Sequence, residues 1–165
     1  MHNRKALLVV DVQNGFLNDH TYHVLDYIRN KVQSSTYDYI IATQFVNHPD
    51  SPYVHFLNWD QMMISNVDTH IDEIIASHDD IIITKQTYSC DKELLDVLSE
   101  NHIDSVDIVG IDSDACVLST ALFLFDHHVD IRVDAQGCAS SAGEEMHHAA
   151  MMIIKRNIGA DRVLL

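Results

Sequence analysis

Three residues of different chemical type each follow an apolar, β-rich run in this chain. Asp11 ends the run ALLVVD, Lys85 ends IIITK, and Cys116 comes shortly after VDIVGI, where an apolar helix is expected to begin. Because parallel strands end at the same edge of a sheet, a carboxylate, an ammonium and a thiol can meet there. A helix N-terminus and a lysine both lower the pKa of a thiol, and a carboxylate can take its proton and return it to a leaving group. These are the groups that nucleophilic catalysis by a thiol needs.

Each of the three residues also has a purely structural interpretation. An Asp at a strand end often caps a turn, a Lys there is usually exposed, and a free Cys is most often a small core residue. Nucleophile-elbow, zincin and P-loop patterns do not occur in the sequence, and the lone Gly110 lacks the spacing of a phosphate-binding loop. Position alone therefore leaves the catalytic and the structural interpretation open.

Strand-like and helix-like segments alternate along the whole chain. Strands are expected at Ala6–Asp11, Tyr39–Gln44, Ile81–Lys85, Val106–Ile111 and Val129–Val133, with a short sixth at Val163–Leu165. Helices are expected at His23–Val32, Thr69–Ala76, Asp91–Glu100, Ala115–Asp126 and Glu144–Arg156. This alternation predicts an α/β fold, a three-layer αβα sandwich with a mostly parallel sheet of five or six strands and a Rossmann-like architecture.

Length and composition limit the class of protein. The 165 residues, 47 % of them hydrophobic, are typical of a globular chain, and we expect a single domain over residues 1–165. Ten basic and 25 acidic residues give a net charge of −15, which argues against nucleic acid or an anionic membrane as partner. We expect no membrane helix and no signal peptide, because the apolar runs are too short. Three cysteines without a C-x-x-C pair indicate free thiols and a cytoplasmic location.

Three segments, taken in order, resemble the isochorismatase-like cysteine hydrolases, a superfamily that includes nicotinamidases and N-carbamoylsarcosine amidases. They are LLVVDVQNGF with Asp11, ITKQTYS with Lys85, and GIDSDACVLSTALFLFDHHVDIRVDAQGCAS around Cys116. The resemblance implies that Cys116 forms a thioester, that Asp11 is base toward the thiol and then acid toward the leaving group, and that Lys85 stabilises the thiolate. It also implies a non-proline cis peptide between Ile111 and Asp112, with the backbone N–H groups of Asp112 and Cys116 as the oxyanion hole.

The chain differs from the nicotinamidases in the segment that, by resemblance, would bind a metal in those enzymes. Nicotinamidases carry an Asp-x-His pattern after the second strand, whereas the matching segment here, ATQFVNH, has Phe45 and Asn47 at those positions. His48 and His55 are nearby, but their spacing is not a recognisable ligand pattern. We therefore expect no metal and no other cofactor, with these histidines in a loop or at the surface.

The nucleophile narrows the reaction. True isochorismatases resemble this fold but tend to lack the nucleophilic cysteine, so Cys116 indicates acyl transfer on an amide, ureido or related C–N bond of a small molecule. Cys90 and Cys138 match no catalytic position, and we interpret them as structural. Two alternatives stay open, a nicotinamidase with a divergent metal site and a catalytically silent binding or oligomerisation module that keeps the fold.

The long irregular segment 45–67 contains both prolines and the single tryptophan, and such a loop in a compact domain is usually functional. Its aromatic residues favour an apolar substrate pocket, although Tyr53 and Trp59 could instead pack at a subunit interface. A homo-oligomer is expected by resemblance, and the methionines of the last helix fit an interface or a core equally well. The predicted pocket residues are Phe16, Gln44, Phe45, Tyr53, Trp59 and Tyr88.

Overall fold

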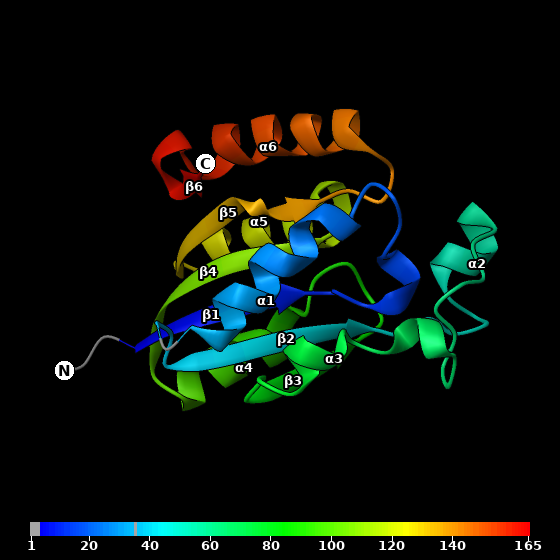
Figure 1. The fold of residues 1–165 in the computed structure, drawn as a ribbon, viewed down its shortest axis with the longest axis horizontal. Coiled ribbons are helices and arrows are strands. Elements are labelled where there is room, and N and C mark those ends of the chain that lie inside the picture. Colours follow the sequence, from blue (N-terminus) through cyan, green and yellow to red (C-terminus); the bar gives the residue numbers. More distant parts are fainter. Residues whose placement is uncertain (1–3, 35) are drawn as a thin grey trace.

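A six-stranded parallel sheet forms the centre of the molecule, in the order β3-β2-β1-β4-β5-β6. The structure is a computed structural model and describes residues 4–34 and 36–165. It confirms the predicted α/β fold, with helices on both faces of the sheet (Figure 1). The strands are β1 (Arg4–Val10), β2 (Tyr39–Phe45), β3 (Ile81–Lys85), β4 (Ile103–Ile111), β5 (Asp130–Ala139) and β6 (Val163–Leu164).

Two layers of helices cover the sheet. The helices are α1 (Leu25–Gln33), α2 (Pro52–Leu57), α3 (Glu73–Ala76), α4 (Asp91–Glu100), α5 (Leu118–Asp126) and α6 (Glu144–Ile158). Side chains of α4, α5 and α6 share one apolar cluster with one face of the strands, whereas α1 and α3 pack against the other face (Figure 1). In the part of the chain that is described, no helix combines the length and the apolar character needed to span a membrane.

The central strand β1 is buried on both of its faces. Ala6, Leu8 and Val10 belong to the cluster under α4, α5 and α6, while Leu7 and Val9 belong to the cluster under α1. This follows from the strand geometry, in which successive side chains point to opposite faces. A continuous apolar run without alternation is therefore what a central parallel strand requires.

The order of the strands reverses between β1 and β4, which lie side by side although they are far apart in sequence. Ligands bind such sheets in the crevice beyond the carboxyl ends of the two strands at this reversal. The strands approach closely there, because a Cβ added to Gly110 would lie 2.1 Å from the carbonyl oxygen of Val10. Gly110 also has a φ of +134°, so only glycine fits this position without strain.

Several element boundaries differ from the sequence prediction, three of them with a change in the type of an element or a large change in its extent. The helix expected from Ala115 starts as a π turn over Ser113–Val117 before α5, because the N–H of Val117 bonds to the carbonyl oxygen of Asp112. The helix expected at Thr69–Ala76 is a 3-10 turn (Val67–Thr69) followed by the one-turn α3. The fifth strand continues six residues beyond its expected end at Val133, to Ala139, through an irregularity in its pairing with β4.

Candidate active site

Asp11 follows β1 directly and is fully buried at the carboxyl edge of the sheet. Its backbone adopts a left-handed conformation with φ of 48°. The hydroxyl of Thr43, on the adjacent β2, donates to Oδ1 of Asp11 at 2.6 Å and accepts from the Asp11 N–H at 3.1 Å. The other oxygen, Oδ2, lies 2.6 Å from Nζ of Lys85. The carboxylate is thus fixed by one hydroxyl and one ammonium.

Lys85 ends β3 and reaches across β2 to the same point. Its Nζ lies 3.4 Å from Sγ of Cys116 and donates to the backbone carbonyl oxygens of Thr87 at 2.9 Å and Tyr88 at 3.1 Å. Burial alone would lower the pKa of Lys85, but the charges of Asp11 and Cys116 raise it, so that the pKa lies above its ordinary value. Lys85 therefore stays protonated, as a buried cation between the carboxylate and the thiol.

Cys116 lies inside the π turn and is only 6 % exposed. Burial raises the pKa of its thiol well above the ordinary value, the charge of Asp11 raises it further, and Lys85 opposes both effects. From the sequence, Lys85 and the helix N-terminus were expected to lower this pKa; Lys85 does lower it, but burial and Asp11 outweigh that effect. In the resting protein the thiol keeps its proton, and a base must remove it during attack.

The backbone beside Cys116 has one of the two features that the resemblance implies. The peptide bond between Ile111 and Asp112 is cis. The carbonyl oxygen of Asp112 accepts from the N–H of Ala115 at 3.1 Å and of Val117 at 3.0 Å, which closes the π turn around the cysteine. The oxyanion hole from the N–H groups of Asp112 and Cys116 stays a prediction, since it requires a bound carbonyl to be tested.

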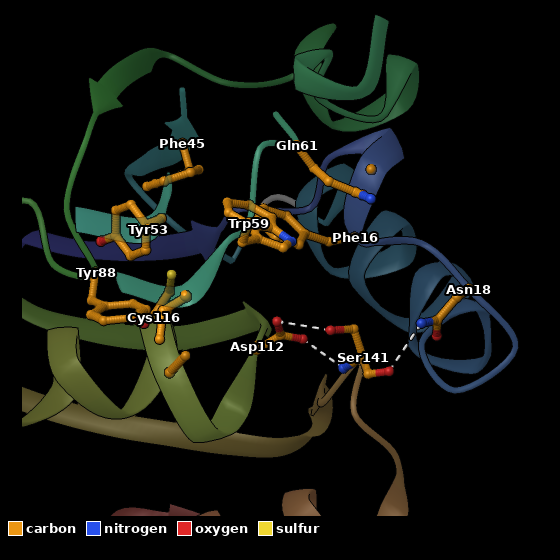
Figure 2. Close-up of a pocket in the computed structure, with 13 residues that line it drawn as sticks. Phe16, Asn18, Phe45, Tyr53, Trp59, Gln61, Tyr88, Asp112, Cys116 and Ser141 are labelled. Carbon is orange, nitrogen blue, oxygen red and sulfur yellow. Dashed lines mark hydrogen bonds between the residues drawn. The ribbon is translucent and has the colours of Figure 1, made fainter. Parts of the chain in front are cut away.

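Cys116 lies at an aromatic-lined cavity of about 410 Å³, which we call the aromatic cavity (Figure 2). Phe16 and Trp59 stack with centroids 6.3 Å apart, and Tyr53 meets both Phe45 and Tyr88 edge-on at 5.2 Å. Five of the six predicted pocket residues therefore line it. The full lining is Gly15, Phe16, Asn18, Phe45, Tyr53, Leu57, Trp59, Gln61, Tyr88, Asp112, Ala115, Cys116 and Ser141.

Gln44, the sixth predicted pocket residue, does not line the aromatic cavity. Its Nε2 donates to the carbonyl oxygen of Thr69 at 2.8 Å, and its Oε1 accepts from the hydroxyl of Thr84 at 3.3 Å. The reason is the alternation of side chains along β2, which sends Phe45 into the cavity and its neighbour Gln44 elsewhere.

The sequence argument missed two residues that hold the site. Thr43 fixes Asp11, and the register of β1 on β2, which pairs Val9 with Ala42, would have revealed it. Ser141 binds the side chain of Asp112, with its N–H 2.6 Å from Oδ1 and its hydroxyl 2.9 Å from Oδ2. Ser141 was missed because β5 was expected to end at Val133, which left residues after Ala139 away from the sheet edge.

Phe45 and Asn47, which stand where the resemblance to nicotinamidases implies metal ligands, do not fit a metal here. Phe45 offers a ring that packs on Tyr53, and the amide of Asn47 donates to the carbonyl oxygens of Trp59 at 3.2 Å and Gln61 at 3.0 Å. Over residues 4–34 and 36–165, the structure contains no group of three or more His, Cys, Asp or Glu side chains that could hold a metal ion. His48 and His55 therefore belong to no such group within these residues. The donor set at these positions therefore lacks the chemistry of metal ligation.

These features agree with a match to a known protein family. The isochorismatase domain family matches residues 5–161. The chain therefore belongs to the isochorismatase domain family and has the fold of its hydrolases. Among proteins of curated function, no match to this sequence is found.

Solved structures share the whole architecture at low sequence identity. An isochorismatase-like hydrolase from Alkaliphilus metalliredigens is 19 % identical with a TM-score of 0.81, over 98 % of this chain and 94 % of that one. A nicotinamidase from Bacillus subtilis is 21 % identical with a TM-score of 0.84, over 98 % and 99 % of the two chains. A pyrazinamidase of Pyrococcus horikoshii, solved in complex with zinc, is 19 % identical with a TM-score of 0.75, over 98 % and 97 %. At these identities the likeness establishes the fold.

Proposed function

We propose that this protein is a cysteine hydrolase that cleaves the C–N bond of a small amide or ureide through a thioester on Cys116. The observation that carries the proposal is the position of Lys85, whose Nζ lies 2.6 Å from the Asp11 carboxylate and 3.4 Å from the Cys116 sulfur. Lys85 thus contacts both other groups, and Cys116 lines a cavity of about 410 Å³, which is large enough for a small molecule.

The first half of the reaction forms the thioester. Asp11 takes the thiol proton as Sγ of Cys116 attacks the carbonyl carbon, and Lys85 compensates the negative charge that passes between carboxylate and sulfur. Charge that develops on the carbonyl oxygen is met by the N–H groups of Asp112 and Cys116. Asp11 then returns the proton to the departing nitrogen, so ammonia or an amine leaves and an acyl group stays on sulfur.

The second half uses water. Asp11 is again a carboxylate and takes a proton from a water molecule as its oxygen attacks the thioester carbon. The C–S bond breaks, Asp11 passes that proton to the sulfur and becomes a carboxylate again, and the product leaves as a carboxylic or carbamic acid. Because burial keeps the Cys116 thiol protonated at rest, the general base Asp11 is needed in both halves.

Replacement of the nucleophile tests this proposal. A panel of small primary amides and ureides is assayed for ammonia release by the wild type, Cys116→Ala and Cys138→Ala, the last a matched control because Cys138 is a buried thiol away from the aromatic cavity. We expect release by the wild type and the control but none by Cys116→Ala, and an acyl mass on Cys116 after rapid quenching. Ammonia release by Cys116→Ala at the wild-type rate would contradict the proposal. So would the absence of ammonia release by the wild type from every compound of the panel.

A metal chelator separates this reaction from that of a nicotinamidase with a divergent metal site. Phe45 and Asn47 support a metal-independent reaction, because neither side chain is a usual metal ligand at this position. We expect hydrolysis by the wild type to continue at the same rate after chelation and gel filtration. Hydrolysis of nicotinamide that stops on chelation and returns with added metal would favour the alternative.

The geometry gives no support to a catalytically silent module. Such a module would not need Asp11 and Lys85 in contact with a cysteine that lines a cavity. A buried ion pair is also expensive to keep where it has no task, since desolvation of both charges offsets much of their attraction.

A further inference from the structure

The side chain of Asp112 is the strongest feature of the aromatic cavity that the proposed mechanism does not use. The mechanism needs only its backbone N–H. Among the described residues that line the cavity, Asp112 is the one with a carboxyl group, and none is a Lys or an Arg. The lysine of the catalytic cluster, Lys85, is already bonded to Asp11, to the sulfur of Cys116 and to two backbone carbonyl oxygens.

The contacts of Asp112 hold it in place without neutralising it. Both of its oxygens accept hydrogen bonds from Ser141, one from the N–H and one from the hydroxyl (Figure 2). Ser141 is itself anchored, because Nδ2 of Asn18 donates to its carbonyl oxygen at 3.0 Å. A carboxylate has about four lone-pair positions, so two acceptor positions remain for a ligand.

The aromatic side chains of the cavity favour the same kind of ligand group. The face of an aromatic ring is negative and attracts cations, most strongly for Trp and Tyr. Phe16 and Trp59 present a stacked pair to the cavity, and Tyr53 and Tyr88 complete the wall beside Cys116. A cation in this cavity gains from the rings and from the carboxylate together, whereas an anion meets repulsion from Asp112 and from a chain of net charge −15.

We propose that Asp112 is a specificity-determining residue, and that it binds a cationic ammonium or amidinium group of the substrate while the amide carbonyl lies at Cys116. The preferred substrate is then a small cationic amide or ureide. The preference for binding a cation depends on the cavity alone. That the bound cation is part of a substrate rests on the proposed hydrolase function.

Fluorescence of Trp59 measures this preference directly, because Trp59 is the single tryptophan of the chain and lines the cavity. The probes are three benzamides with the same ring, carrying an aminomethyl, a hydroxymethyl or a carboxyl group, each in the meta and the para form. They differ in charge at similar size, being cationic, neutral and anionic. Titrations are made well above the pKa of Asp112, which burial raises to about 6.

We expect the wild type to bind the better aminomethyl isomer about ten- to a hundredfold more tightly than its hydroxymethyl counterpart, and the carboxyl compound most weakly. Asp112→Asn should remove most of this preference, since its amide oxygen still accepts from the Ser141 N–H but carries no charge. Asp114→Asn is the matched control, because it removes an equal charge from a neighbouring residue that does not line the cavity. It should keep the preference.

Three results would overturn the assignment. They are equal binding of the charged and neutral probes by the wild type, an undiminished preference in Asp112→Asn, and no response of Trp59 to any probe at millimolar concentration. Failure of the hydrolase proposal looks different. In that case the cation preference and its dependence on Asp112 persist, while the ammonia-release panel shows no reaction that depends on Cys116.

Discussion

Asp11 and Asp112 directly follow the two neighbouring central strands, β1 and β4, at the same edge of the sheet, where Asp112 lines the aromatic cavity and Asp11, which does not line it, contacts Lys85. Asp11 is fully buried and has a cation at 2.6 Å. Asp112 is partly exposed, and among the residues that the structure describes its side chain is bonded only to Ser141, which is neutral. The two carboxylates thus have equivalent positions in the sheet but different electrostatic surroundings, a cation for Asp11 and neutral donors for Asp112.

The difference teaches how one edge of a sheet can support two tasks. A carboxylate paired with a lysine can exchange a proton with a thiol, because the positive charge of the lysine balances the negative charge on either group. A carboxylate held by neutral donors keeps its charge available for a ligand. Its ionised form is less stable, however, because burial without a counter-ion disfavours the charge. Substitutions that exchange or remove these surroundings should therefore affect the two residues in different ways.

The largest effect is expected for Asp11→Asn. An amide cannot take the thiol proton, so kcat/KM for the best substrate of the panel should fall by about 10²- to 10⁴-fold. Ammonia release measures the loss, and circular dichroism shows whether the fold is kept. Activity within tenfold of the wild type in a folded variant would mean that another group is the base.

Removal of the cation should have the next largest effect, on stability. Lys85→Met leaves the Asp11 carboxylate buried without its counter-ion, and breaking a buried pair in this way costs about 3–5 kcal/mol. The double variant Asp11→Asn with Lys85→Met removes both charges and should recover much of this loss. Urea unfolding of the two variants measures the difference, and equal stabilities would show that the pair is not electrostatically coupled.

Loss of the hydroxyl that holds Asp11 should be smaller. Thr43→Val keeps the shape of the side chain but removes the 2.6 Å bond to Oδ1 of Asp11, which should lower the free energy of unfolding by about 1–3 kcal/mol and reduce turnover. Thr43→Ser retains a hydroxyl and is the control. If both variants unfold and react alike, the hydroxyl contributes nothing to the position of Asp11.

The smallest effect concerns pH and separates the two carboxylates most clearly. Burial raises the pKa of Asp112 from 3.8 to about 6, the Ser141 bonds oppose this, and Asp114 and Asp11 add to it. A raised folded pKa means that the protonated form favours folding. The stability of the wild type relative to Asp112→Asn should therefore be greatest below pH 3.8 and fall as pH rises through about 6.

The preference for a cation should follow the opposite course, appearing as Asp112 ionises above a pH of about 6. Burial and the neighbouring His148 lower the pKa of His147 below its ordinary value. Comparison with Asp112→Asn subtracts the contribution of such groups. Calorimetric unfolding and Trp59 titrations at several pH values test the two trends. A stability difference that rises with pH over this interval would contradict the raised pKa.

Much of the fold could be predicted from the sequence, because its strands are continuous apolar runs and its helices are separated from them at regular intervals. The runs ending at Asp11 and Lys85 were found at their positions, and so were α4 and α6 to within two residues. The end of β5 was not, because the residues DAQGCA after Val133 are not an apolar run, and pairing with β4 rather than composition keeps them extended.

The sequence by itself showed that an aspartate, a lysine and a cysteine each follow a strand, and the resemblance to a hydrolase family favoured a catalytic over a structural interpretation of them. Tertiary structure alone decided their surroundings. It buried Cys116 enough to raise the pKa of its thiol, turned Gln44 away from the cavity, and gave Asp11 a cation while leaving Asp112 with neutral donors. The physical reason is that pKa and charge compensation depend on distance and burial, which residues far apart in sequence set only when the chain is folded.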